Sequence, residues 1–426
     1  MNTITDGVVA RNIKRISRLD IPGGGQVIVK GDYAYIGHMD PPHGTSILDV
    51  SDPRNPRVLS KIDLPDNHSH SHKVRVNDEI MIVNVEQYNR HFLRLGEKIP
   101  ELKESLEKTL GRAPTDKELA QALKVKESDL PVLAEAHKRG YHEGGFKVYD
   151  IADRTRPREL AHVKTHGFGT HRFDADENYA YISTEMEGYI GNILVIYDMA
   201  SPERPEEVSR WWMPGQHLAG GEQPTWPGYR NRLHHAMRQG DKLWASVWHA
   251  GFRVLDVSDI TAPKTLGEYD YHPPFPEPTH TVLKLPFPVG GKDVAVVIDE
   301  EHDHATGQPH AFLWVFDVGD LGDIRPLSTY HVSEADSPWS GKGGRFGAHQ
   351  FQEHFRDTRV YATWFSGGLR VIDVARPELP EEIAYFIPEP GKGAEAPQSN
   401  DVDVDERGLI YLIDRINGLD ILEITV

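Results

Sequence analysis

A short apolar strand followed by an aspartate and a proline-containing turn recurs along the chain, and this repeat constrains the fold more than any other feature. Examples are TSILDVSDPRNPRVL, NILVIYDMASPERPE and GLRVIDVARPELPE. The last copy, GLDILEITV, ends the chain without the strand that follows the turn elsewhere. Repeats of roughly 40 to 50 residues with four short strands each are typical of propeller blades. The spacing therefore predicts an all-β ring of blades.

Seven copies of the repeat predict a seven-bladed β-propeller that spans residues 1–426 as a single domain. The seventh blade lacks its fourth strand, and the N-terminal segment VARNIKRISRLDIP has the pattern of such a strand. Pairing this segment with GLDILEI would close the ring and leave no free sheet edge. A β-sandwich or two smaller all-β domains stay open as alternatives.

One segment, residues 88–143, interrupts the second blade between its second and third strands. Its composition and spacing are helical, and Thr115 and Glu118 are spaced as a capping box that begins a helix. Short charged helices do not form a core alone, so we expect them to pack on the nearby rim or on a partner subunit. The insertion is therefore expected to act as a lid or as an arm for homo-oligomer formation.

Histidines begin the first strand of five blades, at equivalent positions of the repeat. They are His72, His171, His235, His280 and His349. Equivalent positions of a closed ring converge at its axis, so we expect these imidazoles to surround one cavity and to ligate a metal ion. Neighbouring residues on a strand face opposite ways, and in blade 4 we choose His235 over His234. His70 shares a face with His72 and can also point inward.

The end of the second strand supplies another polar set at the same rim, because the first two strands of a blade are antiparallel. The expected catalytic residues are Glu86, Glu185, His249, Glu300 and Arg415. A shift of one residue turns a side chain to the other face, so Glu187 and Glu301 stay open as alternatives. The glutamates are expected to accept hydrogen bonds from the ligand histidines and to fix their orientation.

Neutral imidazoles suit Fe(II), Cu, Zn or Ni and suit Mg or Ca poorly. Four or five histidines around an axis can leave a coordination position for water, O₂ or substrate. Fe(II) is our first expectation, with Mn, Zn or Cu as alternatives. Arg230, Arg232, Arg345 and Arg415 lie near the same rim and can either hold a small anionic substrate or pair with the rim glutamates.

The formal net charge is −18, and the chain contains no cysteine. An acidic surface argues against nucleic acids and anionic membranes as partners. Without cysteine there are no disulfides, thiolate ligands or cysteine nucleophiles. No stretch approaches the roughly 18 apolar residues of a membrane helix, and the first residues do not have the pattern of a secretory signal. We therefore expect a cytoplasmic protein that acts on a small molecule.

The segments ILVIYDMASPERPE, FRVLDVSDITAPK, LRVIDVARPELPE and RGLIYLIDRINGLDILE resemble the LVIVD-repeat family of β-propellers. The resemblance extends over nearly the whole chain except the segment after Glu86. It implies propeller blades but no particular reaction, because propellers carry many functions. The layout is also similar to two other seven-bladed groups, the carotenoid-cleavage oxygenases and the selenium-binding, methanethiol-oxidising proteins.

Three functions are compatible with these patterns. The first is a metal-dependent oxidoreductase or oxygenase that acts at a His-ligated metal on a small organic substrate, which can be an anion. The second is a metal-dependent hydrolase, lyase or isomerase in which a Glu or His moves the proton. The third is a non-catalytic scaffold, which does not need a ring of axial histidines. The pattern favours the first.

Overall fold

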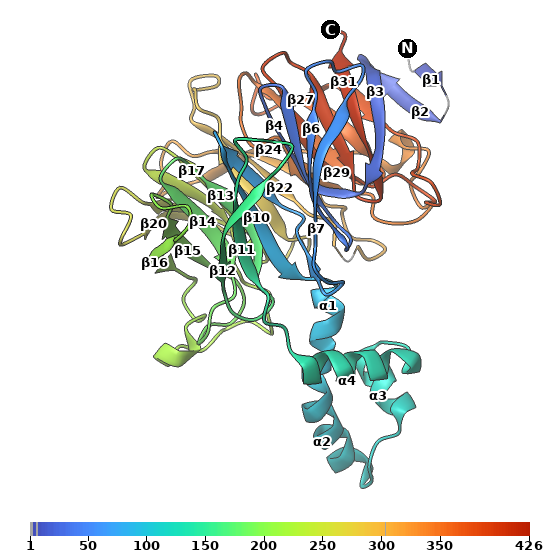
Figure 1. The fold of residues 1–426 in the computed structure, drawn as a ribbon, viewed down its shortest axis with the longest axis vertical. Helices are drawn as coiled ribbons and strands as arrows, with labels where there is room; N and C mark the ends of the chain where they lie inside the picture. Colours follow the sequence, from blue (N-terminus) through green and yellow to red (C-terminus); the bar gives the residue numbers. More distant parts are fainter. Residues whose placement is uncertain (1–2, 6, 303) are drawn as a thin grey trace.

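The computed structural model of the protein describes residues 3–5, 7–302 and 304–426. Its strands form seven antiparallel sheets with four main strands each. The innermost strand of every sheet contacts the innermost strands of the two neighbouring sheets, so the sheets form a closed ring of blades (Figure 1). The prediction of an all-β, seven-bladed propeller with a helical insertion in blade 2 is confirmed.

The strands of blades 1 to 4 follow the chain in order. Blade 1 contains β4 (Gly24–Lys30), β5 (Tyr33–His38), β6 (His43–Asp49) and β7 (Arg57–Asp63). Blade 2 contains β8 (Ser69–His70), β9 (Val74–Asn77), β10 (Ile80–Gln87), β11 (Gly145–Asp150) and β12 (Arg158–Lys164). Blade 3 contains β13 (Thr170–Ala175), β14 (Tyr179–Thr184), β15 (Ile193–Asp198) and β16 (Glu206–Trp211). Blade 4 contains β17 (His235–Gln239), β18 (Lys242–Ser246), β19 (Phe252–Asp256) and β20 (Lys264–Tyr269).

Blades 6 and 7 both take strands from the start of the chain. Blade 5 contains β21 (Thr279–Lys284), β22 (Val294–Asp299), β23 (Leu313–Asp317) and β24 (Arg325–Tyr330). Blade 6 contains β25 (Ala348–Phe351), β26 (Arg359–Trp364), β27 (Gly368–Asp373) and β28 (Glu381–Ile387), extended by β2 (Val8–Arg11) and β1 (Thr3–Thr5). Blade 7 contains β29 (Ser399–Val404), β30 (Ile410–Asp414), β31 (Asn417–Ile424) and β3 (Ile13–Pro22).

The N-terminal strand β3 closes the ring. It pairs antiparallel with β31 and places Leu19 opposite Leu419, as the incomplete seventh repeat predicted. Arg15 and Arg18 also form ion pairs with Asp420 at 2.7 and 3.2 Å. The N-terminal strand β3 and the last strand β31 therefore belong to the same sheet, where they lie side by side (Figure 1).

The apolar runs of the repeat belong to the middle strands of each blade. In β22 all six residues are buried, whereas in the outermost strand β24 none is fully buried. Each face of a middle strand packs against a different neighbouring blade, so consecutive residues are apolar instead of alternating. One continuous hydrophobic cluster, for example, joins residues of blades 4, 5 and 6.

The insertion between β10 and β11 holds most of the helical residues. It contains α1 (Arg90–Leu93), η1 (Arg94–Lys98), α2 (Ile99–Leu110), α3 (Asp116–Leu123), η2 (Glu127–Asp129) and α4 (Leu130–Arg139); two further turns are η3 (Leu218–Gly220) and η4 (Glu334–Asp336). The capping box is present at the start of α3, where Thr115 accepts a hydrogen bond from the amide of Glu118. Contrary to our expectation, α2, α3 and α4 form a small apolar core of their own, and Figure 1 shows them extending away from the propeller.

Deleting residues 1–21 should lower the unfolding temperature and broaden the transition, because it removes most of β3. Ile13 and Ile21 are buried, and each contributes about 2 kcal/mol to the free energy of unfolding. A deletion of residues 1–11 keeps β3 and is the matched control, which should cost less. Scanning calorimetry measures both variants, and an unchanged unfolding temperature for the longer deletion would contradict closure by β3.

Candidate metal centre

An irregularity in the first strand marks the same position of the repeat in five of the seven blades. The pairing of the first two strands shifts by one residue at His171, His280 and His349. The same shift occurs at Gly25 in blade 1 and at Asn400 in blade 7. The extra residue of such a bulge is unpaired, and its side chain is re-aimed. The repeat therefore brings these positions together.

His72 and His234 complete an arc of five imidazoles with the three bulged histidines. Ring centroids are separated by 5.2 Å from His72 to His171 and by 4.8 Å from there to His234. The next steps, to His280 and to His349, are 4.3 and 4.4 Å. All five rings are buried except that of His171, which is half-buried. The structure thus brings together four of the five histidines expected to meet.

Blade 4 contributes His234 to the arc instead of the expected His235. The amide of His234 donates to the carbonyl of Ser246, and β17 begins at the following residue. His235 lies one layer deeper, where its Nδ1 is 3.2 Å from Arg172 and 3.7 Å from the Glu353 carboxylate. Because side chains alternate along a strand, a shift of one residue moves the imidazole from the arc to the next layer.

The rim position of blade 4 shows the same shift of one residue. Trp248 lies at the position assigned to His249, and its ring centroid is 4.9 Å from that of His234. His249 contacts Arg230 and His272 instead. The alternative Glu187 is exposed. Glu301, the other alternative, is buried and accepts a hydrogen bond from His310 at 2.5 Å.

A cavity of about 580 Å³ lies over the histidine arc. The expected rim residues Glu86, Glu300 and Arg415 line it, together with Asn89, Arg90, His91 and Phe92 of the insertion. Arg90 forms an ion pair with Glu86, and Arg94 forms one with the remaining expected rim residue, Glu185. Helix α1 and the following turn η1 are therefore each tied to the rim by one arginine, and part of the insertion forms one wall of the cavity.

Burial makes the imidazoles of the arc neutral. It is the largest cause that lowers the pKa of His171, His234, His280 and His349 well below the ordinary value. Neighbouring cations act in the same direction, whereas Glu300 acts to raise the pKa of His234 and His349. A neutral imidazole carries one proton, so the hydrogen bond at one ring nitrogen decides whether the other nitrogen has a free lone pair.

Four histidines have an acceptor at Nδ1. The partners are the Glu86 carboxylate for His171 (3.0 Å), the His280 carbonyl for His234 (2.8 Å), the Gln350 amide oxygen for His280 (2.9 Å) and the Asn400 carbonyl for His349. The Gln350 amide is oriented by its NH₂ group, which donates to Glu353. Each Nδ1 must therefore carry the proton, and each Nε2 has a free lone pair.

The most informative contact joins two of these free nitrogens. Nε2 of His171 and Nε2 of His234 are 3.0 Å apart. With both protons held at Nδ1, neither ring has a proton to share in this contact. Two nitrogens that ligate one ion at about 2.1 Å and at roughly a right angle are also about 3.0 Å apart. The spacing fits a pair of metal ligands.

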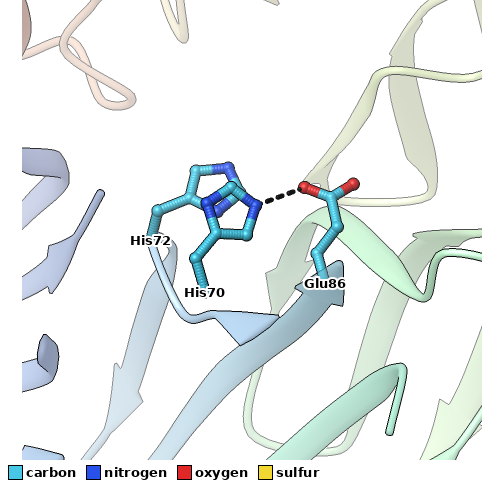
Figure 2. Close-up of side chains that lie close together, drawn as sticks. All are labelled: His70, His72 and Glu86. Atoms are coloured by element: carbon cyan, nitrogen blue, oxygen red, sulfur yellow. Dashed lines mark hydrogen bonds and ion pairs between the residues drawn. The ribbon is translucent and has the colours of Figure 1, made fainter. Parts of the chain in front are cut away.

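His70, His72 and Glu86 form a second group beside this pair (Figure 2). The rings of His70 and His72 stack at 4.1 Å, and His70 Nε2 is 2.9 Å from Glu86. His72 differs from the other four, because its Nδ1 faces the NH₂ group of Asn84 and its proton is therefore at Nε2. The Asn84 orientation is fixed, since its oxygen accepts from the amide of Lys73.

The propeller thus contains buried His and Glu groups that could bind a metal. Both His70, His72 and Glu86 and the set His234, His280 and Glu300 place their ligand atoms within 4.8 Å of one another. In the first group the Glu86 carboxylate already accepts from His171, contacts His70 Nε2 at 2.9 Å and pairs with Arg90. The second set has free nitrogens and faces His171 and His349.

The sequence patterns did not identify Arg90 and Arg94, or the roles of Asn84 and Gln350. The two arginines lie in a helical segment whose position over the cavity depends on tertiary packing. Asn84 and Gln350 do lie on strands next to the histidines. A buried imidazole that ligates a metal through one nitrogen needs a hydrogen-bond partner for the other nitrogen, so these amides could have been predicted as such partners from the sequence.

Comparison with known proteins supports the architecture. The family model described as LVIVD repeat matches residues 24–63 and 240–271, which cover blade 1 and the last three strands of blade 4. The resemblance found in the sequence is confirmed, and the chain contains LVIVD repeats. No curated protein matches the sequence. Among the described residues, no helix has both the length and the apolar character needed to cross a membrane.

Solved structures share the fold at very low identity. A chain in the structure of the mitotic checkpoint complex aligns over 96% of this chain and 94% of its own length, with a TM-score of 0.54 and 8% identity. A chain in a structure of S. cerevisiae dbp5 bound to nup159 and gle1 aligns over the same shares, with a TM-score of 0.50 and 8% identity. These likenesses show the propeller fold alone.

Replacing residues 90–142 by a short Gly/Ser linker should open the cavity, because it removes α1 and the ion pairs of Arg90 and Arg94. Diethyl pyrocarbonate should then modify the arc histidines faster than in the wild type, while circular dichroism stays that of a propeller. Replacing only residues 99–139 keeps α1 and is the matched control. Equal modification rates in all three proteins would contradict a covering role for α1.

Proposed function

We propose that this protein is a metal-dependent oxidoreductase that holds one transition-metal ion, with Fe(II) as first choice, at Nε2 of His171, His234, His280 and His349. The observation that carries the proposal is the 3.0 Å contact between two unprotonated nitrogens. Lone pairs at this distance repel each other, and a cation between them turns the repulsion into attraction. A scaffold without a ligand would gain nothing from this buried contact.

The ligand set selects the metal. Four neutral nitrogens match Fe(II), Zn and Cu, whereas Mg and Ca require oxygen ligands. His171, His234, His280 and His349 would hold the ion, and a bound iron would supply the oxygen chemistry that side chains lack. The cavity volume of about 580 Å³ suits a small organic molecule.

The surrounding residues hold the ligands in place. Glu86 accepts from His171 at 3.0 Å, and Gln350 accepts from His280 at 2.9 Å. The carbonyl of Asn400 does the same for His349. These bonds fix the tautomer and the ring orientation of each ligand. Of the four histidines, His234 and His280 place their ligand atoms within 4.8 Å of each other and of Glu300.

The carboxylate nearest to the ligands favours a redox reaction over hydrolysis, elimination or isomerisation. Glu300 lies 3.9 Å from His280 Nε2 and 4.0 Å from His349 Nε2. Burial raises the pKa of Glu300, but the neighbouring charges, Arg345 first, outweigh burial and hold this pKa well below its usual range. One oxygen of Glu300 already accepts from Arg345 at 2.6 Å, so this carboxylate is engaged in an ion pair and is less available to take up a proton.

His234→Ala should weaken Fe(II) binding by at least about tenfold, because it removes a ligand. His235→Ala should leave iron content unchanged, since that ring faces the layer below. Elemental analysis of untagged protein after loading with Fe(II) measures both, with far-ultraviolet circular dichroism as the test of folding. Full iron content in a folded His234→Ala variant, or loss of iron only in His235→Ala, would contradict the site.

Iron-loaded wild-type protein should bind nitric oxide, a stand-in for O₂, and give the electron paramagnetic resonance signal of a ferrous nitrosyl. The signal requires bound iron with an open coordination position, and it should be weaker in His171→Ala because that variant loses a ligand and retains less iron. Absence of the signal in fully loaded wild type, together with ester or lactone hydrolysis by the zinc-loaded protein, would favour the acid–base alternative instead.

A further inference from the structure

Three arginines from separate parts of the chain line the cavity above the histidines. Arg90 comes from α1, Arg345 from the segment between β24 and β25, and Arg415 from the turn between β30 and β31. The side chains of Arg90 and Arg345 are only 12% and 23% exposed. Grouping these cations in a shielded place is unfavourable unless anions lie close to them.

Two of the three arginines have a carboxylate partner. Arg90 pairs with Glu86, and Arg345 donates to Glu300 at 2.6 Å. Arg415 donates only to the amide oxygen of Asn400, at 3.2 Å. No carboxylate oxygen of the described chain lies within ion-pair distance of Arg415. The third carboxylate of the cavity wall, Asp40, accepts from the hydroxyl of Tyr88.

Arg415 is also in an electrostatically unfavourable position. Burial lowers the pKa of Arg415 to about 10, and the charge of Arg345 contributes in the same direction. The two cations therefore repel each other across the cavity, although Glu300 partly offsets this repulsion. An anion between them would relieve the repulsion and would use N–H groups of Arg415 for which the described residues provide no acceptor.

The position of Arg415 relates it directly to the proposed metal ligands. Asn400 accepts from Arg415 with its side chain, and its carbonyl accepts from Nδ1 of His349. Arg345 reaches the same side of the arc through Glu300, which lies about 4 Å from His280 and His349. A ligand held by the two arginines is therefore beside the free nitrogens of the arc.

The rest of the wall indicates the kind of anion. Met39, Phe92, Trp248 and Ile416 line the same cavity and offer apolar surface. A guanidinium presents a planar fork that matches a carboxylate with two parallel hydrogen bonds. One unpaired arginine beside apolar side chains suits a monocarboxylate with a hydrophobic body better than a phosphate dianion.

We infer that Arg415, with Arg345, forms a carboxylate-binding subsite and that the substrate of the proposed metal centre is a small organic monocarboxylate. The inference rests on the proposed function for the identity of the reacting site. It goes beyond that function because it names the substrate class and the residues that orient it. Arg415 is the specificity-determining residue in this arrangement.

Isothermal titration of zinc-loaded protein with benzoate, acetate and inorganic phosphate tests the subsite. Zinc replaces iron because it does not react with O₂. Benzoate should bind wild type most tightly, and Arg415→Gln should weaken it by at least about tenfold. Arg415→Lys keeps the charge but loses the fork, and should fall between the two. Arg376→Gln changes an exposed arginine outside the cavity and should bind like wild type.

Zinc content is measured first in every variant, so that the two proposals can fail separately. If zinc does not bind wild type, the proposed function fails, and titration of the metal-free protein still tests Arg415. Unchanged benzoate affinity in Arg415→Gln, or no binding of either carboxylate by wild type, would overturn the subsite. Tighter binding of phosphate than of benzoate would overturn the carboxylate class.

Discussion

The hydrogen bonds at the outer nitrogens of the histidines are the interactions on which the proposed site depends. Geometry alone brings five imidazoles to one end of the axis, but it does not decide which nitrogens are free. Backbone carbonyls and fixed amides make that decision, because a carbonyl can only accept and a neutral imidazole has one proton. Four rings therefore present a lone pair, and His72 does not. The repeat brings the histidines together, and their hydrogen-bond partners decide which of them present a free Nε2 to a metal ion.

A second layer of side chains beneath the arc supports this arrangement. Glu353 accepts from Arg172 at 2.9 Å and from Gln350 at 2.8 Å, and it also pairs with Arg75. Gln350 in turn orients His280 with its other amide atom. A larger cavity of about 810 Å³ at Arg75 and Glu353 shares no lining residue with the histidine cavity. The charged layer thus separates the two cavities and keeps the deeper His235 apart from the arc.

The period of the repeat was sufficient to predict the blades, the closure by β3 and the insertion, because each rests on strand patterns that are local in the sequence. The site was predicted less completely. His171, His280 and His349 were found because the repeat aligns them, but in blade 4 two adjacent histidines satisfied the pattern equally well. The choice between His234 and His235 depends on where the bulge or strand start lies, which apolar spacing does not specify. Arg90 was not predicted because its position depends on how α1 packs on the rim, which is a tertiary contact.

The proposed anion-binding cavity does not conflict with the acidic composition of the protein. The net charge of −18 is spread over the whole chain, and charges separated by more than about 8 Å of physiological salt solution are largely screened. Inside the cavity water is reduced, so the near cations Arg345 and Arg415 act more strongly than distant carboxylates. Four neutral ligands would also leave the full charge of a divalent ion uncompensated. The three arginines and three carboxylates of the wall balance each other, so the proposed divalent ion would make the local charge positive, and the surface acidity affects solubility and partner choice more than it affects the ligand.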